Sequence, residues 1–393
     1  MSIKKVLILS GEVSGDMLAG GLVRSLKKIN SEASYFAMGG EGIKSAGAEL
    51  IADINELSVM GFTEVLIRIK KIYAIFKRIS RWITVNRPDL VILVDFPSFN
   101  LKIARLSHGL GIPVVYFIPP KIWASRYKRI RLIKKYIKLV IVIFPFEIEI
   151  YKKEGIEAYY FGNPLYFKYI TSGFKTPPRE GPFAEKEASC LKSHEKLSPV
   201  IAFLPGSRKP ELRYHSLRII KSMRAIKSEY PDALFLIPFR QGIDFSYFLS
   251  ALKKNNIPEE WFCITGSVER TLKKSDLFIV ASGTASLEGS FFKKPMIIVY
   301  YLNYLTYLIA RAAVRVKYIG LINIIAGKPV VPELIESDFN PENVLSYVKK
   351  MLSDKEYSRE LVKEISDTVE KLKTDSDIYE GAARLIYGKI DKL

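Results

Sequence analysis

Three short segments rich in glycine, serine and charged residues follow apolar runs that have the length of β-strands. The first, SGEVSGD (10–16), comes directly after KKVLIL and begins a helical segment. Gly11 and Gly15 allow tight turns and the close approach of a ligand. The carboxylates of Glu12 and Asp16 suit hydroxyl recognition or proton abstraction, with helix capping as the alternative for Asp16.

The second segment, LPGSR (204–208), follows the apolar run VIAF and combines a turn with a cation. Gly206 and Ser207 can present backbone amides to an anion, and the planar guanidinium of Arg208 suits a phosphate. Pro-Gly-Ser is also ordinary turn chemistry, so this segment does not define a site by itself.

The third segment, SGTASLE (282–288), follows DLFIV. Ser282, Gly283 and Thr284 stand at the expected start of a helix, where free N–H groups attract anions. Glu288 lies one turn after Thr284 and is placed to accept hydrogen bonds from two vicinal ribose hydroxyls. Together with LPGSR, this segment predicts a site for a nucleoside diphosphate. No Walker A or DxD motif accompanies it, so we expect neither a metal nor a cofactor.

The elements that must position these segments are apolar strands that alternate with helices. Uninterrupted apolar strands separated by helices predict parallel sheets covered on both faces. We therefore expect an α/β fold with two Rossmann-like doubly wound domains whose strand ends face each other across a cleft. The first domain would span 1–170 and the second 199–340, joined by a polar linker at 171–198. Helices at 341–393 would pack on the first domain or on a partner chain.

Composition excludes several classes of protein. The 393 residues are 48% hydrophobic, which excludes a disordered chain, and no run approaches the roughly 20 apolar residues that span a bilayer. Cys190 and Cys263 are far apart and lack CxxC spacing, so we expect neither a disulfide framework nor a zinc site. These features indicate a protein of the reducing cytoplasm.

The net charge of +19 is concentrated in two segments. Residues 62–83 carry six basic residues and one acidic residue, and 125–138 carry seven basic residues and no acidic one. In the first segment, one helical face collects Val65, Ile69, Ile72, Phe76, Ile79 and Ile83. A cationic amphipathic helix is typical of a membrane surface element, and an ordinary core-facing helix is the alternative. No nucleic-acid-binding motif accompanies the charge, so we do not expect nucleic acid as a partner.

Seven stretches of the chain resemble the lipid-A-disaccharide synthase family over nearly the whole length. They are SGEVSGD, LSVMGFTEVL (57–66), PDLVILVDFPSFN (88–100), FPFEIEIYKKEGI (144–156), LPGSR, ASGTASLE (281–288) and NIIAGKPVVPELI (323–335). The resemblance implies an inverting, metal-independent glycosyltransferase at the inner face of the cytoplasmic membrane. Its donor would be UDP-2,3-diacylglucosamine and its acceptor 2,3-diacylglucosamine 1-phosphate. The products would be a β-1,6-linked disaccharide 1-phosphate and UDP.

Roles for individual residues follow from this resemblance. Asp95 is the leading candidate for the base that activates the acceptor, Glu12 and Asp16 come next, and a structural hydrogen bond is the alternative for Asp95. Arg208 and the helix start at 282–284 would stabilise the departing diphosphate. The expected substrate-binding residues are Gly11, Ser14, Gly15, Asn100, Gly206, Ser207, Arg208, Ser282, Gly283, Thr284, Glu288, Asn323 and Glu333.

Three single positions depart from the family pattern, and the segment 119–125 keeps only part of the family motif S-P-x-x-W-A-W. Ser98 stands where the family has a second aspartate in D-x-P-D-F-N, Asn163 replaces the histidine of G-H-P, and Glu336 replaces a glutamine. These changes leave open a related UDP-sugar enzyme with another glycolipid acceptor or an epimerase activity. A basic nucleic-acid-binding protein and an inactive membrane scaffold are the alternatives of other classes. Whether two copies of the chain form a homodimer is also left open by the sequence.

Overall fold

The computed structural model describes residues 3–57, 64–171, 173, 187, 190, 199–206, 208–239, 245–302 and 316–390, with the backbone alone at 57 and 64–68. Most of the stretch 57–66 and of the predicted linker 171–198 therefore lies outside the described residues, as does Ser207. The chain divides into two units. Unit 1 comprises Met1–Phe167 and Leu372–Leu393, and unit 2 comprises Lys168–Lys371.

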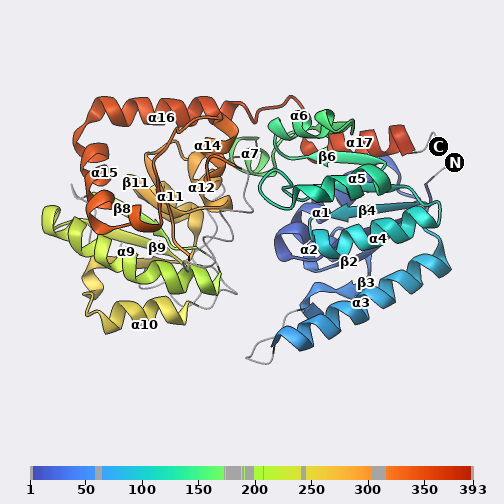
Figure 1. Ribbon diagram of the computed structural model, residues 1–393, viewed down its shortest axis with the longest axis horizontal. Coiled ribbons are helices and arrows are strands. Elements are labelled where there is room, and N and C mark those ends of the chain that lie inside the picture. Colours follow the sequence, from blue (N-terminus) through green and yellow to red (C-terminus); the bar gives the residue numbers. More distant parts are fainter. Residues whose placement is uncertain are drawn as a thin grey trace. The chain divides into compact units, whose positions relative to one another are not determined.

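The described part of unit 1 contains a seven-stranded parallel sheet in the order β3-β2-β1-β4-β5-β6-β7 (Figure 1). Its strands are β1 (Lys5–Ser10), β2 (Ser34–Gly39), β3 (Glu49–Asp53), β4 (Leu90–Val94), β5 (Val114–Phe117), β6 (Leu139–Val142) and β7 (Ala158–Tyr160). Its α-helices are α1 (Val13–Ile29), α2 (Glu41–Ser45), α3 (Glu64–Asn86), α4 (Pro97–Gly109), α5 (Ile130–Tyr136), α6 (Phe146–Lys153), α7 (Pro164–Tyr166) and α17 (Ile378–Ile390).

Both faces of this sheet are buried, because successive residues of each strand point to opposite sides. In β1, Val6 and Ile8 pack with apolar residues of α1 and α17, whereas Leu7 and Leu9 pack with those of α3, α4 and α5. The continuous apolar strands in the sequence reflect this double coverage. The C-terminal helix α17 lies against α1, so it belongs to the core of unit 1 (Figure 1).

The described part of unit 2 contains a six-stranded parallel sheet in the order β10-β9-β8-β11-β12-β13. Its strands are β8 (Val200–Leu204), β9 (Leu234–Pro238), β10 (Phe262–Thr265), β11 (Leu277–Ala281), β12 (Met296–Tyr300) and β13 (Glu333–Ile335). Its α-helices are α9 (Lys209–Glu229), α10 (Ser246–Lys254), α11 (Val268–Lys274), α12 (Thr284–Ser290), α14 (Leu321–Ala326), α15 (Pro341–Ser353) and α16 (Lys355–Glu370). The predicted α/β fold with two doubly wound sheets is confirmed.

The cysteines correct one expectation. Cys190 and Cys263 form a disulfide that links two positions 73 residues apart, with their Cα atoms 6.1 Å from each other. Nearby, the buried carboxylate of Glu187 lies 3.0 Å from Nε of Arg270 and accepts a hydrogen bond from the Gly266 amide. The sequence did not reveal this pairing, because only the fold brings Cys190 to Cys263 of β10.

Candidate active site

The carboxyl ends of β1 and β4 bring SGEVSGD and DFPSFN together. The two strands are neighbours, with Ser10 opposite Val94 in the register. A side chain at Gly11 would place its Cβ 2.2 Å from the Phe96 ring, so glycine is required for the loops to approach this closely. A Cβ at Gly15 would lie 3.8 Å from Cβ of Asp95. The structure therefore places the first predicted segment beside the leading candidate base.

Asp95 is held in an unusual backbone conformation. Asp95 and Phe96 have φ values of 47° and 44°, in the left-handed region, which costs about 1–3 kcal/mol for such residues. Two side chains fix this turn through the carbonyl oxygen of Asp95, which accepts hydrogen bonds from Asn100 Nδ2 at 2.7 Å and the Tyr116 hydroxyl at 2.8 Å. Asn100 thus positions Asp95 from a fully buried site.

The environment of the Asp95 carboxyl suits a proton acceptor. Burial raises its pKa, while a hydrogen bond from the Phe96 amide and the charge of Lys121 act in the opposite direction. A carboxylate with a raised pKa is a stronger base than an exposed aspartate. The geometry is therefore compatible with the catalytic role expected of Asp95.

The two carboxylates of SGEVSGD have different surroundings. Asp16 is buried and accepts hydrogen bonds from the amides of Gly40 and Gly42, both at 2.7 Å, and of Ile43 at 3.2 Å. Its oxygens thereby hold the start of α2, which favours a structural role. Glu12 is exposed beside the start of α1 and makes no capping bond there. Of this pair, Glu12 is the better placed to meet a substrate, and Ser14 is exposed beside it.

Sequence reasoning missed Glu147, which is 2% exposed at the start of α6. It accepts hydrogen bonds from Nε1 of Trp123 at 2.8 Å and from the amide of Phe144 at 3.1 Å. Burial raises the pKa of Glu147 to about 7. The residue lies within the stretch FPFEIEIYKKEGI, but its burial depends on the segment around Trp123, which a linear reading does not reveal. Glu147 links the loop after β5 to the end of β6.

In unit 2, the LPGSR loop ends β8 and leads into α9. Gly206 has a φ of 109°, and a Cβ there would lie 2.5 Å from Oε2 of Glu211. Glu211 accepts hydrogen bonds from the amide and from Nη1 of Arg208, both at 3.3 Å. The Arg208 side chain is nonetheless 78% exposed. Its guanidinium therefore extends from the strand end into solvent, where it can meet an anion.

The segment SGTASLE follows β11, the strand next to β8 in the sheet. Gly283, with a φ of 133°, precedes α12, which begins at the exposed Thr284. The Ser282 hydroxyl donates to the carbonyl of Ile319 at 2.8 Å, and Glu288 is buried one turn into the helix. Because β8 and β11 are adjacent, their two loops meet at one edge of the sheet, as a diphosphate site requires.

Asn323 and Glu333 act on the backbone near this edge. Glu333 accepts hydrogen bonds from the amides of Ile319 and Gly320, both at 2.9 Å, and from Asn323 Nδ2 at 2.8 Å. Asn323 is fully buried, and its Oδ1 accepts bonds from the amides of two neighbouring residues. The pair fixes the backbone of Ile319 and Gly320. The carbonyl oxygen of Ile319 in turn accepts the hydrogen bond from the Ser282 hydroxyl. These contacts position the loop.

His215 braces the LPGSR loop from within unit 2. It is fully buried; its Nδ1 lies 2.8 Å from the carbonyl oxygen of Pro205, and its Nε2 accepts a bond from the Tyr301 amide at 3.1 Å. This pattern requires the neutral ring with hydrogen on Nδ1. Burial, the largest influence, lowers the pKa of His215.

The free energy of unfolding should therefore fall as the pH drops below about 6.5, because the unfolded state then binds a proton that the folded state resists. His215→Gln should weaken this dependence in urea titrations between pH 5 and 8. His108→Gln, at an exposed position, is the matched control and should leave it unchanged. Parallel pH profiles for His215→Gln and the unmodified protein would contradict the assignment.

The sequence profile of the lipid-A-disaccharide synthetase family matches residues 6–384, nearly the whole chain. The chain belongs to this family. Curated relatives agree: lipid-A-disaccharide synthase of Myxococcus xanthus is 34% identical over 88% of both chains. Lipid-A-disaccharide synthase 1 of Legionella pneumophila strain Philadelphia 1 is 34% identical over 94% of this chain and 93% of its own. The protein is thus a glycosyltransferase of lipid A biosynthesis.

Solved structures show the same fold at low sequence identity. A putative UDP-N-acetylglucosamine 2-epimerase from Listeria monocytogenes has a TM-score of 0.66 and 13% identity, covering 100% of this chain and 98% of its own. A glycosyltransferase from Rickettsia africae has a TM-score of 0.58 and 13% identity over the full length of both chains. These likenesses confirm the GT-B type of fold.

The departures from the synthase pattern have local structural explanations. Ser98 lies exposed in the first turn of α4, where its Oγ accepts a hydrogen bond from Nη2 of Arg129 at 2.9 Å. Asn163 caps α7 and donates to the carbonyl of Ile143. Glu336 accepts a hydrogen bond from the Leu302 amide at 2.9 Å. Each replacement is a hydrogen-bonding residue with partners in its own unit.

Part of the amphipathic face predicted in α3 is core. Ile79 and Ile83 are fully buried, and Phe76 packs edge-on against Phe99 with ring centroids 5.7 Å apart. The partly buried Ile72 packs against the same core, and the side chain of Val65 lies outside the described residues. The periodicity could not separate the two interpretations, because a core face and a membrane face repeat alike. Among the predicted face residues, Ile69 is 56% exposed.

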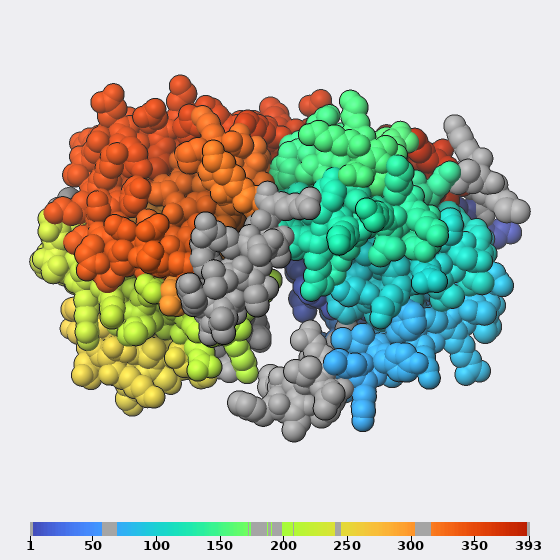
Figure 2. Space-filling view, viewed as in Figure 1, coloured from blue at the N-terminus to red at the C-terminus, as the bar shows by residue number. Residues whose placement is uncertain are grey.

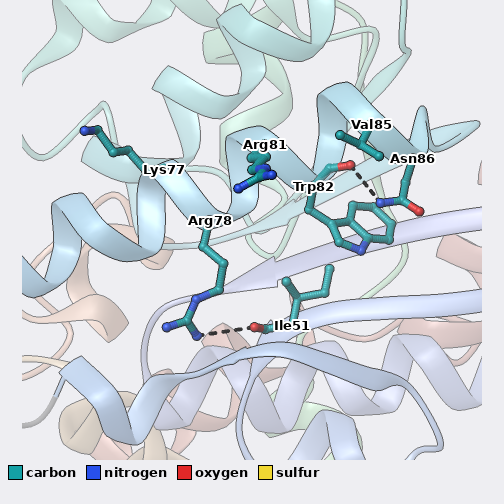
Figure 3. Close-up of a pocket in the computed structure, with 7 residues that line it drawn as sticks. All are labelled: Ile51, Lys77, Arg78, Arg81, Trp82, Val85 and Asn86. Atoms are coloured by element: carbon teal, nitrogen blue, oxygen red, sulfur yellow. Dashed lines mark hydrogen bonds between the residues drawn. The ribbon is translucent and has the colours of Figure 1, made fainter.

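An open cationic groove of about 730 Å³ runs along α3 and includes Ile51 of β3 (Figure 3). The groove is lined by Ile51, Lys77, Arg78, Arg81, Trp82, Val85 and Asn86. Nη1 of Arg78 donates to Glu56 at 2.9 Å, and Lys77, Arg78 and Arg81 are all exposed. This helix lies on the surface of unit 1, in the light-blue region of Figure 2. No helix within the described ranges is long and apolar enough to cross a membrane.

Proposed function

We propose that the protein transfers diacylglucosamine from UDP-2,3-diacylglucosamine to 2,3-diacylglucosamine 1-phosphate and releases UDP. The observation that carries this proposal is the family match over residues 6–384, which includes the loop segments of both units. The product is a β-1,6-linked disaccharide 1-phosphate. The exposed Arg208 and the start of α12 at one sheet edge support a diphosphate leaving group in unit 2.

Solved structures of similar fold support a uridine nucleotide as the donor. An S. aureus protein with a TM-score of 0.65 was solved with UDP, and Anabaena HepE with UDP and glucose has a TM-score of 0.55. We assign the diphosphate of this chain's donor to Arg208 and the α12 start, and its ribose to Glu288. Arg208 would stabilise the charge that develops on the diphosphate as it leaves.

We assign the proton transfer to Asp95. Its carboxylate takes the proton of the acceptor's 6-hydroxyl while that oxygen attacks the anomeric carbon from the face opposite to UDP. The new C–O bond forms as the bond to UDP breaks, so the configuration inverts. The raised pKa of Asp95 makes its carboxylate a better base than an ordinary aspartate. Asp95 thus supplies the base, and Arg208 supplies the positive charge that stabilises the leaving diphosphate.

The deciding experiment is an assay of UDP release and lipid product with the synthetic diacylglucosamine pair. We expect one disaccharide 1-phosphate per UDP, with β configuration by NMR. UDP release only with another glycolipid acceptor would replace the acceptor assignment. Interconversion of UDP-sugars without an acceptor would favour an epimerase, the activity named for the Listeria neighbour. If the protein catalyses neither sugar transfer nor interconversion of UDP-sugars under any condition, an inactive scaffold is favoured.

We infer that unit 1 contacts the cytoplasmic face of an anionic membrane through the outer side of α3. Ile69, Tyr73 and Val85 are 56%, 58% and 72% exposed on this helix. The exposed cations Lys70, Lys71, Lys77 and Arg81 accompany them. Such a contact requires apolar side chains that insert into the membrane surface. It also requires cations beside them that bind the phosphate headgroups. An acylated acceptor would be reached at that surface.

Reversing three of these charges should abolish binding to anionic vesicles. Each basic residue near such a surface contributes about 1 kcal/mol, so Lys70→Glu, Lys77→Glu and Arg81→Glu together should weaken binding more than about 100-fold. Cosedimentation with phosphatidylglycerol vesicles measures the effect, with phosphatidylcholine as the neutral reference.

The matched control reverses three exposed cations of α16, Lys355, Arg359 and Lys363, and should bind like the unmodified protein. Equal loss in both triple variants would show a general charge effect and contradict the assignment to α3. Ile72→Ser and Phe76→Ser should instead lower the melting temperature, because both side chains pack against the core of unit 1.

A further inference from the structure

Tyr169 lies where the chain enters unit 2, and its hydroxyl contacts the carboxylate that we assign to the ribose. Unit 2 begins at the preceding residue, Lys168. Both belong to a short π-helix, Phe167–Thr171. This form is rare in proteins overall, and where it occurs it is often at a functional site. The Tyr169 side chain is 1% exposed, and its hydroxyl donates a hydrogen bond to Oε1 of Glu288.

The ring of Tyr169 is fixed by the residues that follow α12. It stacks on Phe291 with centroids 5.6 Å apart and an interplanar angle of 29°. It also meets Phe292 at 5.6 Å and 61°. Because α12 carries Glu288, the ring and the hydroxyl of Tyr169 both contact the same short stretch of chain. The orientation of Glu288 is thereby tied to the entry segment.

Lys168 joins this cluster from its exposed side. Its Nζ lies 2.5 Å from Oε1 of Glu269, 3.0 Å from the Tyr169 hydroxyl and 3.6 Å from Oε1 of Glu288. The Tyr169 hydroxyl also lies 3.3 Å from Glu269. Among the residues that the structure describes, two carboxylates share one lysine and one tyrosine, so these four side chains carry a net negative charge. Such a cluster attracts hydroxyl donors and repels phosphate.

We propose that Tyr169, assisted by Lys168, is a positioning residue that orients the Glu288 carboxylate toward the vicinal hydroxyls of the ribose. The inference rests on the proposed function, because it takes Glu288 as the ribose-binding residue. Oε1 of Glu288 accepts the bond from Tyr169, so this bond fixes the orientation of the carboxylate to which we assign the ribose hydroxyls. The negative cluster directs the ribose to this end of the site and the diphosphate to Arg208.

The test compares the affinities of UDP and 2′-deoxy-UDP, because 2′-deoxy-UDP lacks one of the two hydroxyls that Glu288 would bind. Calorimetry gives the ratio of the two dissociation constants for the unmodified protein, Glu288→Gln, Tyr169→Phe and Tyr160→Phe. Tyr160 is the matched control, because its hydroxyl donates to the carbonyl of Leu372 in unit 1. Tyr169→Phe keeps the stacked ring and removes only the hydroxyl.

We expect the unmodified protein and Tyr160→Phe to prefer UDP by the same factor. In Tyr169→Phe this preference should fall about fivefold, the effect of one weakened hydrogen bond to a charged group. Equal losses of affinity for both nucleotides would indicate a merely structural role and overturn the inference. If Tyr169→Phe does not fold, Lys168→Met makes the same comparison, since the Lys168 side chain is 50% exposed.

Glu288→Gln distinguishes the ribose-binding role of Glu288 from the positioning role of Tyr169. If it leaves the preference for UDP unchanged, the ribose assignment in the proposed function is wrong. If it removes the preference while Tyr169→Phe and Lys168→Met retain it, the proposed function stands and the positioning role fails. Loss of the preference in Glu288→Gln and Tyr169→Phe alike supports both.

Discussion

Asp95→Asn should lower turnover by about 10²–10⁴ and leave the affinity for UDP nearly unchanged, because a sugar hydroxyl is a poor nucleophile without its base. The substitution should preserve the fold. Asparagine adopts the left-handed conformation readily, and the hydrogen bonds from Asn100 and Tyr116 go to the backbone carbonyl of residue 95. Steady-state kinetics and UDP calorimetry on the same preparation provide the comparison.

The carboxylates of SGEVSGD provide the control for this result. Glu12→Gln, at an exposed position, should keep both stability and substantial turnover. Asp16→Asn should lower the melting temperature, because an amide group would face backbone donors that now meet carboxylate oxygens. Near-normal turnover in Asp95→Asn together with an inactive Glu12→Gln would move the base to the SGEVSGD loop.

Ser98→Asp tests the position where the family carries its second aspartate. An aspartate there would lie in the first turn of α4 and pair with Arg129, whose Nη2 already reaches the Ser98 hydroxyl. We expect the change to be tolerated and to maintain or raise turnover with the diacylglucosamine acceptor.

Arg208→Ala should lower turnover by about 100-fold or more, which corresponds to roughly 3 kcal/mol of lost stabilisation of the leaving diphosphate. The side chain is 78% exposed, so its removal should not destabilise unit 2. Arg213→Ala, an exposed arginine of the same helix, is the matched control and should retain activity. Turnover should also persist in EDTA. Unchanged turnover in Arg208→Ala, or complete inhibition by EDTA, would contradict this mechanism.

The sequence predicted the fold and the placement of the loops because parallel sheets constrain both. Each motif directly follows an apolar strand, and the carboxyl ends of parallel strands meet at one edge. The neighbouring positions of β1 and β4, and of β8 and β11, could therefore be anticipated from strand–helix alternation. This is why SGEVSGD lies beside Asp95, and why LPGSR and SGTASLE share an edge.

Individual side chains could not be predicted in the same way, because their partners are distant in sequence. Asp16 is a catalytic candidate by its place in the motif, whereas its hydrogen bonds with the amides of Gly40 and Gly42 favour a structural role. Asn323 and Glu333 belong to a matching motif but bind backbone. Tyr169 belongs to none of the quoted motifs, although it contacts Glu288 across 119 positions of the chain. A motif identifies a location, and the role of each residue depends on the neighbours supplied by the fold.

The return of the chain to unit 1 has a consequence for biosynthesis. Ile378, Ala382 and Ile386 of α17 are buried in the same core as Leu22 of α1, and the hydroxyls of Tyr35 and Tyr387 lie 2.8 Å apart. In a nascent chain, the apolar face of α1 that packs against α17 stays exposed until α17 has left the ribosome, whereas unit 2 is one continuous segment that is made before α17. Unit 2, although its synthesis begins later, is therefore the first unit that can complete its core. A chain truncated before α17 would expose the apolar face of α1 and be prone to aggregation.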